Sequence, residues 1–264
     1  MQSKNYIDQM GRRVDIGLPV SRIVSIVPSQ TELLVDLGLE NKIVGVTRFC
    51  IHPKDLRSKT VNVGGTKQLH LDRIRALKPD LIIGNKEENE RSDIEALETE
   101  FPVWMSDIVT VSDALEMIRQ LGEITATQTK ATAIIQQITS DFEELQQFAQ
   151  QYSSKKVAYL IWKDPMMCAG KGTFIDEMLQ LIQLENVQQK NRYPELHERV
   201  EEPEVILLSS EPYPFKEKHL KELQTEFPNA KILLVDGEIF SWYGSRLLHA
   251  KKGMMEILQL IHQS

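Results

Sequence analysis

The sequence predicts an α/β fold of two lobes, each built around a mainly parallel sheet, with one long rigid helix joining them. Three observations lead to this expectation. Apolar strands alternate with helical segments, as in a parallel sheet covered by helices. Two segments of the first half recur in the second at nearly equal offsets. Residues 111–151 contain no proline and carry apolar residues at helical spacing.

The first lobe is expected over residues 22–110, after a lead-in at 1–21. A proline follows its first strand, and Ser29 is expected to cap the next helix, with Glu32 three residues on as in a capping box. The expected strands are 23–27, 42–46, 80–84 and 103–105, and the expected helices start at Ser29 or cover 71–78 and 88–100, with an irregular stretch at 47–67.

The second lobe, expected over residues 153–264, shows echoes of the first. The segment KPDLIIG around Pro79 recurs as EPEVILLS around Pro203, 124 positions later, and TEFPVWM recurs as TEFPNAKILLV. The connector at 111–152 is expected to break at 122–127 and to end in a helix of about 25 residues. A long helix of this kind permits only modest closure of two lobes around a ligand.

Composition excludes several function classes. The chain is 41% hydrophobic and 26% charged, typical of a globular protein, and its net charge of −7 gives no attraction to nucleic acid. The first twenty residues contain no apolar run, so neither a signal peptide nor a membrane span is expected there, which leaves a cytoplasmic location open. We expect a monomer without a cofactor.

Enzyme chemistry finds little support in the motifs. The sequence has no P-loop, no dinucleotide-binding glycine fingerprint, no nucleophile elbow and no zinc-binding H-E-x-x-H helix. Ser29 stands at a strand-to-helix turn where a nucleophile could act, but a capping role explains it as well. The chain is therefore not expected to be an enzyme.

Loops at the carboxyl ends of the predicted strands carry the residues that we expect to bind a ligand, because open α/β sheets bind ligands there. They combine aromatic rings with a few polar and charged groups. The expected ligand contacts are Pro28, Ser29, Arg48, Phe49, His52, Lys67, Asn85, Lys86, Trp162, Met166, Tyr193, Trp242, Tyr243 and Arg246.

The segment FCIHP raises the alternative of a metal site. Cys50 and Cys168 of the second lobe are both expected in loops that border the cleft, and with His52 they could form a soft site for copper, zinc or haem iron. The Cys-x-His spacing is not an established ligand pattern, however. The preferred interpretation is a ligand lip in which Phe49 makes the contact.

Three features together resemble the substrate-binding proteins of ABC transporters that share a helical backbone. These are the segment RIVSIVPSQTELLVDLGL, the VGG before LHLDRIRALKPDLIIG, and the long connecting helix. The resemblance implies two Rossmann-like lobes in the class III periplasmic-binding-protein fold. Family members deliver cobalamin, haem, siderophores or metal ions, and the segments GVTRFCIHP, YPELHE and SWYGSR are most similar to the cobalamin-binding members.

Several residue roles follow from this resemblance alone. Phe49 matches an aromatic residue against the corrin ring, Tyr193 matches an aromatic of the second lobe, and Arg246 matches a ligand-facing arginine. Thr66 and Asn85 stand where the cobalamin binders have tryptophans, which weakens the case for cobalamin itself. Carboxylates that dock onto permease arginines are expected at Asp72 and Glu198.

The leading hypothesis is an importer's substrate-binding protein. It would capture a corrinoid, haem or iron-siderophore chelate in a cleft between the lobes and deliver it to a membrane permease, in the periplasm or at the cell surface. A second hypothesis is an intracellular carrier for a metal or tetrapyrrole, and a third is an α/β enzyme.

Overall fold

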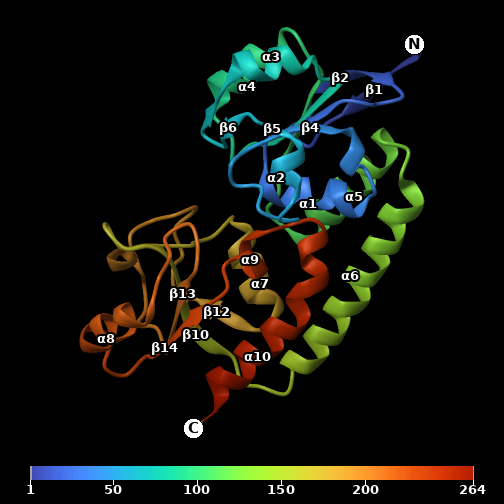
Figure 1. Ribbon diagram of the computed structural model, residues 1–264. Coiled ribbons are helices and arrows are strands. Elements are labelled where there is room, and N and C mark those ends of the chain that lie inside the picture. Colours follow the sequence, from blue (N-terminus) through green and yellow to red (C-terminus); the bar gives the residue numbers. More distant parts are fainter. Residues whose placement is uncertain (1, 264) are drawn as a thin grey trace. The chain divides into compact units, whose positions relative to one another are not determined.

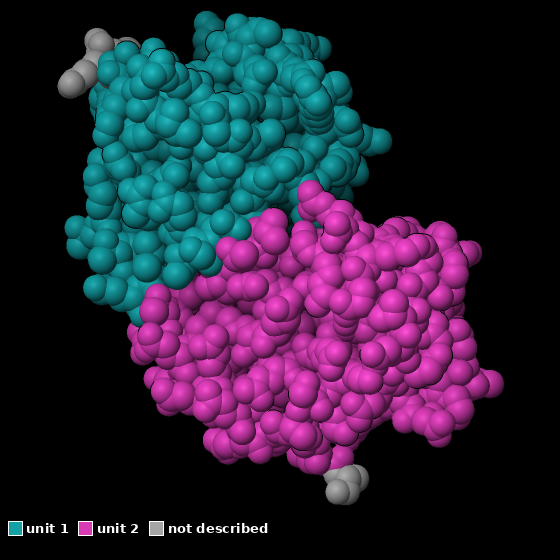
Figure 2. All heavy atoms as spheres, turned by 180° about the vertical axis from the view of Figure 1, so that it is seen from behind, with its two compact units in different colours: residues 1–108, 112–136, 243–245 teal, residues 109–111, 137–242, 246–264 magenta. Residues whose placement is uncertain are grey.

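The computed structural model describes residues 2–263, which form two compact units. Unit 1 contains residues 1–108, 112–136 and 243–245, and unit 2 contains residues 109–111, 137–242 and 246–264 (Figure 2). The chain has the expected α/β composition, with strands and helices in alternation (Figure 1). Within residues 2–263, no helix has the length and apolar character needed to cross a membrane.

The sheet of unit 1 is parallel throughout, with strand order β5-β4-β3-β8-β9. The elements formed before the connector are β1 (Gln2–Ile7), β2 (Arg13–Leu18), β3 (Ile23–Ser25), α1 (Pro28–Asp36), η1 (Glu40–Lys42), β4 (Ile43–Val46), α2 (Leu56–Lys59), β5 (Val61–Asn62), β6 (Gly64–Gly65), β7 (Gln68–Leu69), α3 (Leu71–Leu77), β8 (Leu81–Asn85), α4 (Arg91–Glu98) and β9 (Val103–Ser106).

The register of this sheet sorts its side chains onto two faces. Val24 pairs with Ile82, and Ile82 pairs with Val103, so these three side chains lie on one face. They form a buried cluster with Ile74 of α3 and with Ile94 of α4. Helices α3 and α4 therefore cover the same face of the sheet.

The start of α1 differs from the sequence prediction. The helix begins at Pro28 and its N-cap is Val27, without a side-chain cap. Proline lacks an N–H and its φ is already helical, so it occupies the first helical position and the N-cap lies at Val27 instead of Ser29. Ser29 is consequently inside the first turn, and the predicted Ser29–Glu32 capping box is wrong.

Two further segments had not been anticipated. Residues in the lead-in form an antiparallel hairpin, β1 with β2, which belongs to unit 1. The stretch 47–67, expected to be irregular, contains the short elements α2, β5 and β6. These elements are too short to produce a hydrophobic period that sequence patterns can detect.

The connector consists of two helices, α5 (Val111–Ile124) and α6 (Gln128–Ala149). The predicted break at 122–127 and the long final helix are both confirmed, and α6 has 22 residues. The boundary between unit 1 and unit 2 falls within α6, so each unit contains part of this helix.

Unit 2 contains a five-stranded, mainly parallel sheet in which β10 pairs with β13 and β13 with β14. Strand β11 runs antiparallel to β10. The elements that follow the connector are β10 (Lys155–Trp162), β11 (Met167–Cys168), α7 (Phe174–Leu181), β12 (Leu184–Asn186), η2 (Leu196–Glu198), β13 (Val205–Ser209), α8 (Glu217–Glu226), β14 (Lys231–Val235), α9 (Glu238–Ser241), η3 (Ser245–His249) and α10 (Ala250–His262).

The echoing sequence segments occupy equivalent places in the two units. KPDLIIG forms β8 and EPEVILLS forms β13, and each pairs in parallel with the strand that follows the Glu-Phe-Pro segment, β9 or β14. The repeat in the sequence is therefore a repeat of adjacent strand pairs.

Asp8 closes the turn of the N-terminal hairpin and attaches it to the sheet of unit 1. Its Oδ1 accepts from the backbone N–H groups of Met10 and Arg12 at 3.0 and 2.8 Å. Its Oδ2 accepts from the Arg12 guanidinium at 2.7 and 2.9 Å and from the N–H of Met105 in β9 at 3.3 Å. All these partners are donors, and the Asp8 carboxylate is buried.

Asp8→Asn should lower the free energy of unfolding by about 2 to 4 kcal/mol, because an amide N–H₂ would face donors in a buried position. Chemical denaturation followed by fluorescence of the buried Trp104 measures this. Asp15→Asn, at an exposed position of the same hairpin, is the matched control and should change little. Equal effects of both variants would contradict the assigned role of Asp8.

Glu211 holds the segment after α9 in unit 2 through a buried carboxylate. Its Oε1 accepts from Ser241 Oγ at 2.7 Å and from Trp242 Nε1 at 2.8 Å. Burial raises the pKa of the Glu211 carboxyl above its usual value, and the nearby carboxylates of Glu238 and Asp236 act in the same direction. Folding therefore moves the titration of this carboxyl to higher pH.

A carboxyl whose pKa is raised by folding destabilises the protein above that pKa, and this cost disappears as the pH falls toward the unfolded value. Glu211→Gln, which retains an acceptor oxygen, should therefore stabilise the protein at pH 7. The gain should shrink as the pH is lowered toward 4.5, as thermal denaturation at several pH values would show. Glu143→Gln, exposed on α6, is the control. A gain that stays constant with pH would refute this assignment.

Candidate functional site

The parallel sheet of unit 1 brings the ends of four strands to one edge. The chain leaves β3, β4, β8 and β9 at this edge, because parallel strands share their direction. Loops at such an edge are the usual ligand sites of α/β sheets. Most of the residues predicted in the first half lie on these loops.

Phe49 is the most prominent of them, following β4 with 47% of its surface exposed. The Arg48 guanidinium carbon lies 4.9 Å from the centre of its ring. A Cβ added to Gly65 would lie 3.3 Å from both Phe49 Cε2 and Arg48 Nη2. The glycine in β6 therefore gives these two side chains room to lie against the backbone.

Ser29, Asn85 and Tyr243 are buried, so they present no surface to a ligand. Asn85 Nδ2 donates to Ser106 Oγ at 2.9 Å, and its Oδ1 accepts the N–H of Glu87. Burial raises the pKa of the Tyr243 phenol well above its usual value, with the Glu88 carboxylate as the next cause. These three predicted contacts instead form the interior support of the loops.

Two predicted lysine contacts are already engaged. Lys67 Nζ donates to the backbone carbonyl of Glu87 at 2.6 Å. Lys86 Nζ pairs with the Asp107 carboxylate at 2.5 Å. Of the remaining contacts in this unit, Pro28 and His52 are half-buried. The two ammonium groups therefore fasten loops of unit 1 to one another.

The cysteines do not support the metal-site alternative. Cys50 is buried, and its Sγ lies 3.1 Å from Thr31 Oγ1 and 3.3 Å from Thr47 Oγ1. Burial raises the pKa of the Cys50 thiol, and burial raises the pKa of Cys168 to about 11. A metal needs the thiolate. Across residues 2–263, no group of three or more His, Cys, Asp or Glu side chains could hold a metal ion.

Cys168 also lies elsewhere than expected. It belongs to β11 and to the core cluster of unit 2, with Leu160, Leu196 and Leu208, instead of a loop at the surface. The prediction of a loop position was wrong because β11 is only two residues long and pairs with a bulged part of β10.

Trp162 is the exposed ring of unit 2, at the end of β10. It is 41% exposed, and its Nε1 donates to the Asp164 carbonyl at 3.0 Å. Its ring meets Tyr213 edge-on, with centroids 5.7 Å apart, and Tyr213 meets Phe215 at 4.8 Å. Met166 packs against the core beneath them. This arrangement holds the indole in a fixed orientation with one side open.

Tyr213 belongs to this surface but was not among the predicted ligand contacts. The signal was present, since the segment EPYPF follows β13 and alternates proline with aromatic residues. Tyr193, which was predicted, lies half-buried in a loop that the Cys168 N–H ties down by donating to Pro194 O at 3.0 Å.

Trp242 and Arg246 are less available than predicted. Trp242 is 8% exposed and donates to Glu211, as described above. The Arg246 guanidinium lies 3.5 Å from the Glu238 carboxylate and 5.4 Å from the centre of the Trp242 ring. Both side chains therefore stabilise the segment after β14 before any ligand is bound.

The two predicted docking carboxylates have different surroundings. The side chain of Asp72 is 99% exposed at the start of α3, with Arg75 3.2 Å away. Glu198 pairs with Lys190, and its Oε1 accepts the N–H of Glu195 at 3.3 Å. The Lys190 ammonium is the main reason why the pKa of the Glu198 carboxyl lies below its usual value. Asp72 is the more accessible of the two.

Comparison with known proteins gives the same fold and a family. A profile of the family described as periplasmic binding protein matches residues 23–211. An uncharacterised ABC transporter substrate-binding lipoprotein, YvrC of Bacillus subtilis, is 30% identical over 189 residues, which cover 68% of this chain and 59% of that protein.

Two further similarities concern vitamin B12-binding proteins. The one from Salmonella typhimurium is 26% identical over 174 residues, covering 66% of this chain and 64% of its own length. This chain thus spans about three fifths of these two curated relatives. The solved structure of periplasmic vitamin B12-binding protein BtuF of Vibrio cholerae superposes with a TM-score of 0.77 at 19% identity, covering 93% of this chain and 99% of that one.

The structural match confirms the class III fold, with two α/β units and a long intervening helix. The family profile covers most of both units and reaches the end of β13. On this evidence, the chain belongs to the periplasmic binding protein family.

Proposed function

We propose that this protein is the non-enzymatic substrate-binding component of an ABC importer and that its ligand is a metal chelate of the corrinoid, haem or siderophore class. The family assignment and the similarity to a substrate-binding lipoprotein support the transport role. The similarity to a vitamin B12-binding protein supports the ligand class. The relatives also favour a periplasmic or cell-surface location over the intracellular carrier considered above.

One observation carries the ligand class. Among residues 2–263, Phe49 and Trp162 are the two aromatic residues left exposed, and each stands at the carboxyl end of a parallel strand. An exposed ring on a rigid strand end offers a flat apolar surface. Macrocyclic chelates present such a surface themselves, and its burial favours binding.

Unit 1 has no tryptophan at the two positions, Thr66 and Asn85, where the cobalamin binders carry one. Thr66 and Asn85 are 9% and 2% exposed, so neither position offers a ring to a ligand. Unit 1 therefore contributes Phe49 as its single exposed ring within the described chain. We propose that polar and ionic contacts make up a correspondingly larger part of ligand recognition.

Phe49→Ala and Trp162→Ala should each weaken ligand binding about tenfold, because each removes a ring from the contact surface. A thermal-shift panel of cobalamin, haem and ferric siderophores identifies the ligand, and calorimetry then compares the variants. Ile7→Ala and Leu260→Ala remove exposed apolar side chains elsewhere in unit 1 and unit 2 and serve as controls. A panel in which no member raises the melting temperature would defeat the proposed function.

We further propose that Asp72 and Glu198 contact the permease. Asp72→Asn and Glu198→Gln should leave ligand affinity unchanged, yet each should reduce the stimulation of ATP hydrolysis by the reconstituted transporter several-fold, because each removes a charge at the contact. Asp36→Asn, exposed on α1, is the control. Normal stimulation by both variants would rule out this docking role.

A further inference from the structure

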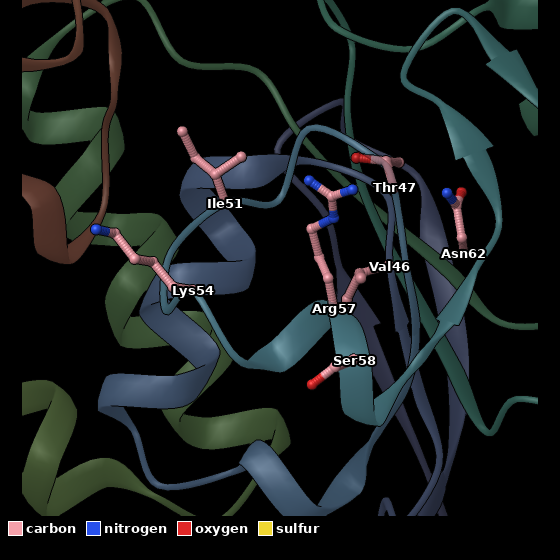
Figure 3. Close-up of a pocket in the computed structure, with 7 residues that line it drawn as sticks. All are labelled: Val46, Thr47, Ile51, Lys54, Arg57, Ser58 and Asn62. Atoms are coloured by element: carbon pink, nitrogen blue, oxygen red, sulfur yellow. The ribbon is translucent and has the colours of Figure 1, made fainter.

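A pocket of about 500 Å³ opens in unit 1 beside the end of β4, and none of the residues predicted to bind ligand lines it. Its walls come from the end of β4, from α2 and from β5, as Figure 3 shows. Its lining residues are Val46, Thr47, Ile51, Lys54, Arg57, Ser58 and Asn62. The pocket contains two cations and no carboxylate.

The charge of this pocket contrasts with the rest of the chain, whose net charge is −7. The nearest acidic residue in sequence, Asp55, is engaged by the ammonium group of Lys59, which also binds Glu40. The Arg57 guanidinium makes no hydrogen bond or ion pair with another side chain or with the backbone within residues 2–263. The pocket therefore stays positively charged, because the Asp55 carboxylate is already paired with Lys59.

The polar groups of the pocket include donors that lack acceptors. Asn62 Oδ1 accepts the N–H of Gly64 at 2.9 Å, which leaves its amide N–H₂ without an acceptor in the described chain. Figure 3 shows the Arg57 guanidinium and the Thr47 hydroxyl directed toward one another, with Asn62 across from them on β5 and Lys54 pointing away. The Thr47 side chain is buried and its Oγ1 lies 3.3 Å from Cys50 Sγ, so Arg57 and Asn62 are the pocket donors open to an acceptor.

We propose that this pocket binds an oxyanion, either carboxylate or phosphate, through Arg57 with Asn62 as an additional donor. A guanidinium presents its N–H groups in the geometry that carboxylates and phosphates match with two parallel hydrogen bonds. The two donors and the absence of acidic lining select a negatively charged group.

The occupant that we assign is an acidic arm of the transported chelate, which rests on the proposed function. Thr47 directly precedes Arg48 and Phe49, so the pocket lies next to the exposed ring of this unit. A chelate stacked on Phe49 can reach the pocket with a propionate or phosphodiester arm. Lys67 and Lys86, the lysines among the predicted ligand contacts, are occupied within the protein, whereas the Arg57 side chain has no ion pair in the described chain.

The test compares ligands with and without the acidic arm; haem and its dimethyl ester differ only in the propionates, whereas cobinamide lacks the whole nucleotide loop of cobalamin. Calorimetry with the full chain uses haem against haem dimethyl ester, and cobalamin against cobinamide, which lacks the phosphodiester. Wild-type protein should bind the charged member of the effective pair about tenfold more tightly. Arg57→Gln and Asn62→Asp should abolish this preference, and the aspartate retains the acceptor for the Gly64 N–H. Arg13→Gln, exposed on β2, is the charge-matched control and should retain the preference.

Failure of this inference can be told from failure of the proposed function. Binding of both members with equal affinity, unchanged in Arg57→Gln, would overturn the pocket and leave the transport role intact. Absence of binding by any chelate would count against the transport role, and inorganic phosphate then decides about the pocket. Phosphate binding that Arg57→Gln removes would assign the pocket to a free anion, whereas phosphate binding that is absent or unaffected would overturn it.

Discussion

The parallel pairing of strands within each unit is the constraint from which the rest of the structure follows. In unit 1, Val24, Ile82 and Val103 lie side by side against α3 and α4, and in unit 2, Ala158 pairs with Ile206 and Ile206 with Ile232. A slip of one residue would turn each of these side chains to the opposite face, so burial fixes the register. Parallel strands also require a return connection between neighbours, and the loops that follow their carboxyl ends meet at one edge.

Polar residues at these edges divide into two groups with different tasks. Asn85, Asn89 and Ser106 in unit 1 and Glu211 in unit 2 are largely buried and hydrogen-bonded, and they hold the loops in one conformation. Phe49 and Trp162 are exposed on top of this support. A ligand surface gains precision when a satisfied polar network lies beneath it, because the network limits the movement of the contacting side chains.

Charge pairing decides which cations remain for a ligand. Acidic residues outnumber basic ones by 38 to 31, and several cations near the strand ends are paired with them. Lys86 pairs with Asp107, and Arg246 pairs with Glu238. Arg57 escapes this pairing because Lys59 engages Asp55 in the next turn of the chain. Local competition between ion pairs, more than proximity to a strand end, thus selects the anchor for an anionic group.

The sequence by itself determined the fold class, the strand pairs and the connector. The spacing of apolar residues and the positions of prolines are local properties of the sequence. Residues a few positions apart therefore predicted β8, β9, β13 and β14 and the break before α6. The resemblance to transport receptors also needed only the order of segments. Phe49 and Trp162 were correctly expected at strand ends, although their binding role stays a prediction.

Only the tertiary structure decided which of the predicted contacts are exposed. Ser29, Asn85 and Tyr243 are buried, and Cys168 belongs to the core, because each packs against segments distant in sequence. Asp8 stabilises the hairpin β1–β2 and accepts a hydrogen bond from the N–H of Met105, almost a hundred residues away. No local pattern in the sequence predicts such a contact. The availability of Arg57 depends likewise on where each neighbouring carboxylate is bound, which is settled by packing in three dimensions.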